Sequence, residues 1–167
     1  MSFAAFDPRQ DILNQIGYNY NVYDDDIDRS CISFSYPDGP YKDDICYVPM
    51  LFPNEVRSGE LPNMPFIEVT LVDAPSGTHN VQGDVKENEA YIDFNIYVTN
   101  TDEINKIDTW MPVCKNEIVN LITQNRHVSG CTWMEVIDTG REIVEQTGKT
   151  TIFHHVISIY CFEYNKG

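Results

Sequence analysis

The sequence has few basic residues. Eleven lysines and arginines stand against 26 aspartates and glutamates, so the formal net charge is -15. A chain of this charge repels the phosphates of nucleic acid and the headgroups of anionic membranes. The composition therefore argues against a reader of DNA or RNA. It suits either plain solubility or a surface to which nucleic acid must not adhere.

Long apolar runs and paired cysteines are also missing. No stretch approaches the roughly 20 apolar residues of a membrane helix, and the N-terminus has no pattern of a signal peptide, so we expect neither. The cysteines are odd in number and form no CxxC pair, which argues against a disulfide framework and a structural zinc site. We expect five reduced, mostly buried thiols. These cysteines are Cys31, Cys46, Cys114, Cys131 and Cys161.

Gly148, Lys149 and Thr150 resemble the end of a phosphate-binding loop. That loop needs G-x-x-x-x-G-K-[ST] after a strand and before a helix. Here Ile143 stands where the first glycine is required, and a β-branched and aromatic run follows in place of a helix. We therefore interpret residues 146–149 as the turn of a hairpin.

Two other patterns suggest metal ligands. His154 and His155 are adjacent in a predicted strand, so their side chains point to opposite faces and cannot easily hold one ion. The acidic run 24–28 matches the first positions of a calcium loop, but Arg29 replaces the turn glycine and Ser35 replaces the bidentate glutamate. We expect a solvated acidic loop, and weak calcium binding there stays open. With no G-x-S-x-G elbow either, the residues indicate no catalytic set and no cofactor, so we expect no enzyme.

The first third of the chain begins with the pattern of a short helix. Residues 7–17 predict this helix, with Asp7 as its cap and Pro8 in its first position. Residues 18–23 predict a short strand. Residues 24–63 are rich in proline and tyrosine, and they predict an extended, packed arm with little long regular structure.

From residue 65 onward the pattern becomes regular. PFIEVTLVD (65–73) and EAYIDFNIYVT (89–99) predict strands, and the second alternates strictly between two faces. An apolar stripe from Ile104 to Ile122 predicts a long amphipathic helix with a kink at Pro112.

The last segment predicts a hairpin. Residues 132–146 read as one strand bent at Gly140, and residues 150–164 read as a long final strand. We therefore predict that residues 1–167 form a single α+β domain. It has an antiparallel sheet with one long kinked helix on a face, together with the N-terminal helix and the arm.

Residues 65–164 resemble the tail terminator (tail completion) proteins of long-tailed bacterial and archaeal viruses. The resemblance lies in the strand EAYIDFNIYVTNTD, which runs straight into the helix KIDTWMPVCKNEIVNLI, and in the closing hairpin GREIVEQTGKTTIFHHVISIYCFEY. The arm at 24–63 is longer than a minimal member of that family would need, so the resemblance assigns it no role.

The resemblance implies a virion structural protein of the tail–neck region, assembled in the host cytoplasm. A ring of six copies would cap the tail tube, end its polymerisation and join the tail to the head-side neck protein. The implied partners are other copies of the chain, the tail tube protein and the neck protein. Viral DNA would only pass through the bore, and no membrane would be involved.

The residues that we expect to contact subunits or partners are mainly aromatic, because protein interfaces are enriched in aromatic side chains. They are Tyr91, Tyr97, Trp110, Trp133 and Lys149. A second interpretation places the two tyrosines under residues 36–65 of the same chain, and the sequence favours neither.

Other functions remain open. The nearest alternative is another head–tail connector component, such as a head-closure (stopper) protein or a tail adaptor. A different class is a small-molecule enzyme that uses His154 or His155 with Asp93. A third is an acidic host-interaction protein that mimics DNA, which should carry its acids in spaced rows on one surface.

Overall fold

A computed structural model gives the fold of the chain and describes residues 6–23, 26–35, 45–57, 65–74, 76–78, 85–99, 107–127, 133–147 and 150–166. Three helices and eight strands make up the described residues. The helices are α1 (Arg9–Ile16), α2 (Pro53–Arg57) and α3 (Ile107–Gln124). The strands are β1 (Tyr18–Tyr20), β2 (Arg29–Ser35), β3 (Ile45–Leu51), β4 (Phe66–Asp73), β5 (Ser76–Thr78), β6 (Val85–Thr99), β7 (Trp133–Thr147) and β8 (Thr150–Lys166).

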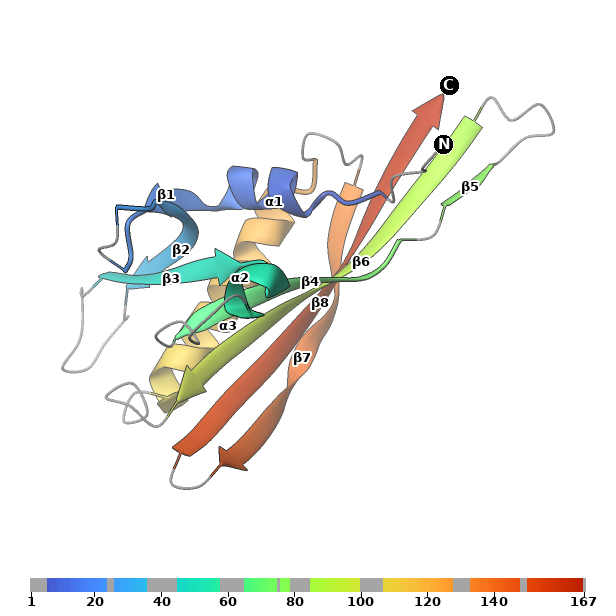
Figure 1. Ribbon diagram of the computed structural model, residues 1–167. Coiled ribbons are helices and arrows are strands. Elements are labelled where there is room, and N and C mark those ends of the chain that lie inside the picture. The colour runs from blue at the N-terminus through green and yellow to red at the C-terminus, as the bar shows by residue number, and fades with distance from the viewer. Residues whose placement is uncertain are drawn as a thin grey trace.

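The strands form one mixed sheet in the order β1-β2-β3-β4-β6-β8-β7, with β5 paired to β6. Every pairing is antiparallel except β3 with β4, which is parallel and joins only two residue pairs. Figure 1 shows β6 and β8 crossing the molecule as a long diagonal pair, whose ends project beyond the helices. The predicted α+β class with a mostly antiparallel sheet is therefore confirmed.

The centre of the sheet is built on β6. Its even-numbered residues from Ala90 to Val98 are fully buried, which confirms the predicted alternation. They lie beside buried residues of β8, including Ile157 and Ile159, through a continuous antiparallel register. Because side chains alternate along a strand, the odd-numbered residues of β6 face the other way.

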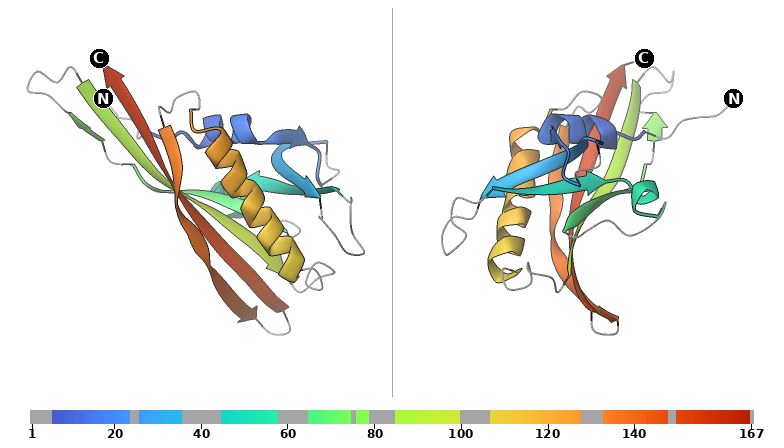
Figure 2. Two further views of the ribbon diagram at one scale, coloured as in Figure 1. Left: turned by 180° about the vertical axis from the view of Figure 1, so that it is seen from behind. Right: turned by 60° about the vertical axis from the view of Figure 1, so that its left-hand side comes forward.

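Helix α3 covers one face of this sheet, as the view from behind shows (Figure 2). Its buried side chains recur at three- and four-residue steps and join the same core cluster as β6 and β8. They are Trp110, Met111, Cys114, Ile118 and Ile122. Pro112 lies inside the helix, as predicted. The kink stays a prediction, and Ile104 and the predicted start of the helix lie outside the described residues.

The prediction of an extended arm at 24–63 is wrong for the described part of that segment. β2 and β3 pair antiparallel over five residue pairs, and α2 follows directly. Proline lowered the expectation of a strand at β3, whereas β2 contains no proline. Pro49 lies within β3, which among the described residues meets β4 only at Met50 and Leu51. Most of β3 therefore resembles an edge strand there, and proline is tolerated in edge strands. Residues 36–44 and 58–63 of the segment lie outside the described residues.

At the N-terminus the helix begins one residue later than predicted. Pro8 occupies the cap position without a side-chain cap, and the Asp7 carboxylate accepts a hydrogen bond from the backbone N–H of Arg9 at 3.2 Å. The helix buries Ile12, Leu13 and Ile16 against the core.

Strand β7 is continuous but irregular, as the predicted bend at Gly140 requires. Val136 lies opposite Ile159, and Arg141 lies opposite Val156. From the first pair to the second, β7 moves on by five residues and β8 by three, so the bulge contains two extra residues of β7. Gly140 has a φ of 107°, and its N–H donates to Asp138 Oδ1 at 2.8 Å. A side chain at this position would overlap the Val156 carbonyl oxygen, so the bulge requires glycine.

Candidate functional site: the open face of the sheet

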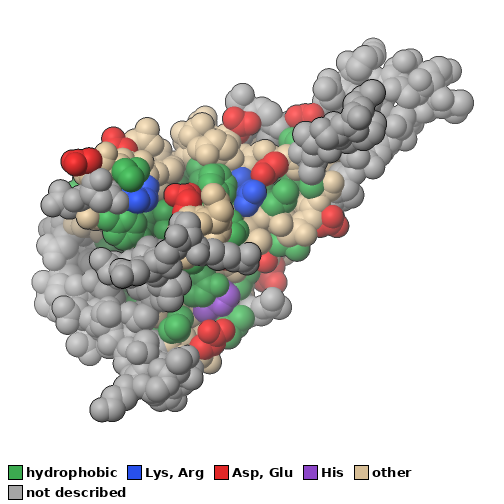
Figure 3. All heavy atoms as spheres, in the orientation of Figure 1, with side chains coloured by type: hydrophobic (Ala, Val, Ile, Leu, Met, Phe, Trp, Pro, Cys, Tyr) green, Lys and Arg blue, Asp and Glu red, His purple; other side chains and the backbone are tan. Residues whose placement is uncertain are grey.

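The face of β4, β6, β8 and β7 opposite α3 is the candidate site, and we call it the open face. It faces the viewer in Figure 1. Figure 3, in the same orientation, shows hydrophobic and acidic side chains side by side on the visible face. Most of the described side chains on this face are neither fully buried nor fully exposed. The described carboxylates on it include Glu68, Glu89, Asp93, Glu135 and Glu145, and the register also places Asp73 opposite Tyr91 and Asp138 opposite Ser158. No lysine or arginine is among the described side chains of its strands.

Two short hydrogen bonds link β6 and β8 across the upper part of the open face. Tyr160 donates its hydroxyl to Glu89 Oε1 at 2.7 Å, and Ser158 donates to Asp93 Oδ1 at 2.7 Å. Tyr91 lies directly opposite Tyr160, with ring centroids 5.3 Å apart. Neutral donors therefore orient both carboxylates without cancelling their charge.

A second network lies lower on the same face and is centred on Asn95. The Asn95 amide donates to the Glu68 carbonyl oxygen at 3.1 Å and to Thr70 Oγ1 at 3.2 Å. Its oxygen lies 3.1 Å from His154 Nε2. Asn95 is only 9% exposed, and these contacts satisfy its polar atoms.

Tyr97 belongs to this lower network and is partly covered by its own chain. Its ring stacks on His154 at 4.2 Å and on Phe66 at 5.1 Å, and it packs against the cluster of Leu51, Val56 and Phe66. Burial raises the pKa of Tyr97, and the nearby carboxylates raise it further. The alternative in which the 36–65 segment covers a tyrosine therefore holds in part for Tyr97, through α2. Tyr91 pairs with Tyr160 instead.

Trp133 lies at the top of β7, half-buried. The Arg126 guanidinium carbon is 4.7 Å from its ring centroid, and the His127 ring packs edge-on at 5.5 Å. The indole N–H of Trp133 donates weakly to Glu135 Oε2 at 3.5 Å. A tryptophan held between a cation and an imidazole keeps a fixed position, which suits a contact residue.

Trp110 does not belong to any surface of the chain. Its side chain is fully buried, its indole N–H donates to Cys46 Sγ at 3.4 Å, and Phe34 packs edge-on against it. The core accounts for this residue, so we remove it from the candidate contacts. Lys149 lies outside the described residues.

The hairpin around residues 148–149 is confirmed by its register. Thr147 lies opposite Thr150, and strands stand on both sides of the turn. A phosphate-binding loop would need a helix after the GKT, and β8 occupies that position.

The two histidines face opposite sides, as predicted. His155 is buried on the α3 side, and its Nε2 lies 3.0 Å from the Thr139 carbonyl oxygen at the bulge. Among the described side chains, Asp93 accepts a hydrogen bond from Ser158 and not from His154 or His155. Among the described residues no group of three histidine, cysteine or acidic side chains could hold a metal ion. Asp24 and Asp25 of the calcium-like run lie outside them.

Four of the five cysteines are described, and all four are free thiols. Burial raises the pKa of Cys31 to about 11 and holds the pKa of Cys114 well above its usual value. A raised pKa keeps the thiol protonated and poorly nucleophilic at neutral pH. Cys131 lies outside the described residues.

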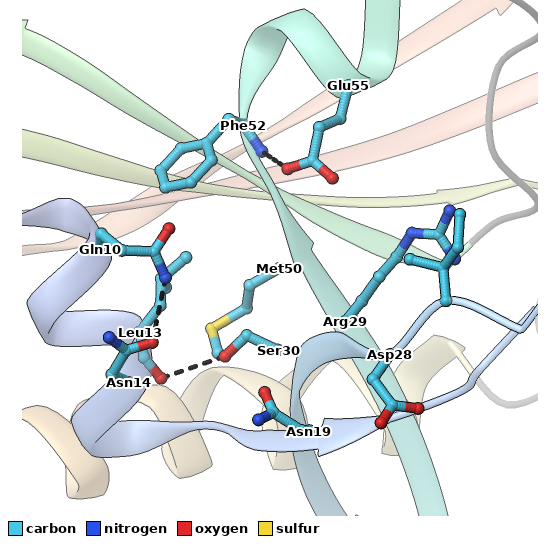
Figure 4. A pocket seen from close by; sticks show the side chains of 11 residues that line it. Gln10, Leu13, Asn14, Asn19, Asp28, Arg29, Ser30, Met50, Phe52 and Glu55 are labelled. Atoms are coloured by element: carbon cyan, nitrogen blue, oxygen red, sulfur yellow. Dashed lines mark hydrogen bonds between the residues drawn. The ribbon is translucent and has the colours of Figure 1, made fainter.

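A small polar cavity of about 210 Å³ lies between α1, β2 and α2 (Figure 4). Its walls include the amides of Gln10, Asn14 and Asn19, while Ser30 donates to the Leu13 carbonyl oxygen and Glu55 accepts from the backbone of Phe52. It contains neither histidine nor cysteine, and it does not include the residues proposed for an enzyme. Asp28, Arg29 and Glu55 also line this cavity, so it can accept a small polar group.

Sequence reasoning missed the partners of the tyrosines on the open face. Glu89, Asp93, Ser158 and Tyr160 come together only through the long-range register of β6 with β8. Alternation predicts that each faces the polar side of its strand, but no local signal sets which residues are opposite one another.

Comparisons with known proteins do not assign a family. None of the helices in the described part of the chain is long and apolar enough to span a membrane. No protein-family model matches this sequence, and no curated protein is similar to it.

Proposed function

We propose that this chain is a virion structural protein that caps a viral tail tube as a ring of six copies, ends tube growth and joins the tail to the head-side neck. The order of strand, helix and long closing hairpin supports the proposal, because this order underlies the resemblance to tail terminators. In such a ring the chain acts by binding and not by catalysis.

The observation that carries the proposal is the open face. A free-standing α+β domain commonly covers an apolar sheet face with helices and leaves a polar face in solvent. Here the uncovered face carries half-buried tyrosines, a tryptophan and carboxylates, which is the composition of a protein contact surface. We propose Tyr91 and Trp133 as contact residues, with Tyr97 at the margin beside α2.

The projecting ends of the sheet provide the reach for such an assembly. β8 has 17 residues, which at about 3.3 Å per residue is about 55 Å of strand. Among the described residues, β8 pairs with β7 alone before Ile152, at its lower end, and with β6 alone after Phe162, at its upper end. We propose that these two ends contact neighbouring copies, with Lys149 in the lower turn. Such heterologous contacts close into a ring when the rotation between copies closes.

Two further features fit the proposed ring. A kink of α3 at Pro112 would let the helix follow the twisted sheet. The charge of -15 would keep DNA from adhering as it passes through the bore.

Electron microscopy of particles made without this gene tests the proposal. We expect full heads beside separate, over-long tubes, because nothing would end tube growth. Tails of normal length detached from leaking heads would instead indicate a head-closure protein. Intact, infectious particles would overturn the structural role.

Mass measurement of the purified protein tests the ring itself. Multi-angle light scattering over a range of concentrations, in the presence and absence of the tube protein, should show a species of six copies. A 19.2 kDa monomer under all of these conditions would contradict the ring.

A further inference from the structure

We infer that the upper open face is a docking surface for a protein that presents arginine and lysine side chains, and not for a second copy of this chain. We call this surface the acidic tyrosine patch. It consists of Glu89, Tyr91, Asp93, Glu135, Ser158 and Tyr160. The inference rests on the proposed function only in that the basic protein would be a neighbouring virion component.

The strand register places three carboxylates around one pair of rings. Glu89 and Asp93 lie two residues before and after Tyr91, so all three share a face of β6. Across the sheet, Tyr160 lies between Tyr91 of β6 and Glu135 of β7. The patch is therefore built by three strands of the sheet and not by a mobile loop.

The carboxylates of the patch are oriented but keep their charge. Tyr160 and Ser158 each donate one short hydrogen bond to a carboxylate oxygen. An ionised carboxylate has about four acceptor positions, so a single neutral donor leaves most of them open. The ion pair found among the described residues joins Arg9 to Asp7, outside the patch.

Rings next to carboxylates suit a guanidinium group. A guanidinium stacks on an aromatic face and forms paired hydrogen bonds with a carboxylate, and both interactions strengthen when water is excluded. Lysine supplies the charge without the planar fork. The patch should therefore prefer arginine over lysine and reject the phosphates of nucleic acid.

Charge also argues against a second copy that docks patch to patch. The chain carries 26 acidic and 11 basic residues, and two patches that met face to face would oppose like charges. Arg9, at the margin beside β4, is already bound to Asp7 and to the Val69 carbonyl oxygen. A basic partner removes the repulsion that a copy would create.

The test compares two variants that each lose three negative charges. The patch variant is E89Q/D93N/E135Q. The control is D11N/D28N/E117Q, which changes α1, α3 and the segment before β2 and leaves the open face unchanged. The probe is a fluorescent ten-residue peptide of alternating arginine and threonine, and binding is measured by anisotropy at two salt concentrations.

We expect the patch variant to bind the peptide about tenfold more weakly than the wild-type protein, and the control to stay within about twofold. Equal losses in both variants would show attraction by net charge alone and would overturn the inference. Absence of binding to the wild-type protein would also overturn it. Circular dichroism and thermal unfolding verify that each variant is folded.

A third variant tests the rings without changing the charge. Tyr91→Leu keeps apolar bulk but removes the aromatic face, and we expect about threefold weaker binding of the arginine peptide. The same peptide with lysine in place of arginine should bind more weakly to the wild-type protein and lose less in this variant. Equal binding of the two peptides would contradict recognition by stacking.

Light scattering on the same samples separates this inference from the proposed ring. A monomer whose patch binds the peptide would overturn the ring and leave the docking surface standing. A ring whose patch variant still binds the peptide normally would support the ring and overturn the docking surface. A patch variant that changes the number of copies would make the patch a subunit contact and overturn the inference.

Discussion

The two faces of the β4–β6–β8–β7 sheet come from the same strands but differ in what covers them. On the α3 side, Ile92, Phe94 and Ile96 are fully buried between the sheet and the helix. On the open face, Tyr91 and Asp93, which alternate with these residues, remain partly exposed. One strand therefore supplies both the core and the candidate contact surface.

The difference teaches where the stability of the molecule lies. A fully buried large apolar side chain contributes about 1.5–3 kcal/mol through removal from water, whereas a typical hydrogen bond contributes about 0.5–1.5 kcal/mol net. The α3 face is rich in buried apolar side chains. The open face is rich in hydrogen bonds, so its side chains can change at little cost to folding and are available for recognition.

The largest expected effect separates the two tryptophans. Trp110→Ala should destabilise the protein by about 3–5 kcal/mol, because it leaves a large cavity in the core. Trp133→Ala should cost only about 1 kcal/mol, since the ring is half-buried and mainly loses its contacts with Arg126 and His127. Urea denaturation of both variants measures the difference, and similar losses would contradict the assignment of one ring to the core and the other to the surface.

The sequence was sufficient to predict the α3 face. The apolar residues of β6 recur at every second position, as in a strand, and those of α3 recur every three or four positions, as in a helix. The structure buries both sets of residues. The bend at Gly140 and the turn at 148–149 were also predictable, because glycine marks both positions.

The open face was predictable only in part. Alternation assigns Tyr91 and Tyr160 to the polar sides of their strands, but the register that brings them together joins residues 69 apart in sequence. Strand β3 was missed because proline lowers the expectation of a strand, while β3 meets β4 at only two of the described residue pairs and tolerates Pro49. Trp110 was misplaced because aromatic type alone does not distinguish a core residue from a contact residue.

A second prediction concerns the bulge that fixes the faces of β7. Gly140→Ala should destabilise the protein by about 2–3 kcal/mol, because the φ of 107° disfavours alanine and the new Cβ overlaps the Val156 carbonyl oxygen. The neighbouring Thr139→Ala, at an exposed position, should cost under about 0.5 kcal/mol. Thermal unfolding measures both, and a Gly140→Ala protein as stable as wild type would show that the bulge does not constrain β7.

A third prediction tests the buried polar centre of the open face. Asn95→Leu keeps the branched shape of the side chain but removes the donors to Glu68 and Thr70 and the contact with His154, so we expect a loss of about 1–2 kcal/mol. The control Asp93→Asn keeps an acceptor for Ser158 and should cost under about 1 kcal/mol. Chemical denaturation measures both, and an Asn95→Leu variant as stable as wild type would mean that this network does not contribute to folding.

The smallest expected effect belongs to an ion pair outside both faces, which gives a background value for surface electrostatics. The side-chain hydrogen bond from Arg9 lowers the pKa of Asp7 below 3.8. A carboxyl whose pKa is lower in the folded state stabilises the protein above pH 3.8, and this contribution is lost as the pH falls through the folded value. Asp7 is 37% exposed, so solvent screens the pair and we expect under about 1 kcal/mol at pH 7.

A double-mutant cycle of Asp7→Asn and Arg9→Gln isolates this coupling. Asparagine retains an oxygen that can accept the backbone N–H of Arg9, so the cycle reports mainly on charge. The coupling free energy from urea denaturation should be positive at pH 7, shrink at high salt and approach zero below the folded pKa. If it instead exceeded the loss in Asn95→Leu, stability at the surface of this protein would depend on charge pairs more than on the hydrogen bonds of the open face. The contrast between the two faces would then need charge as well as burial to explain it.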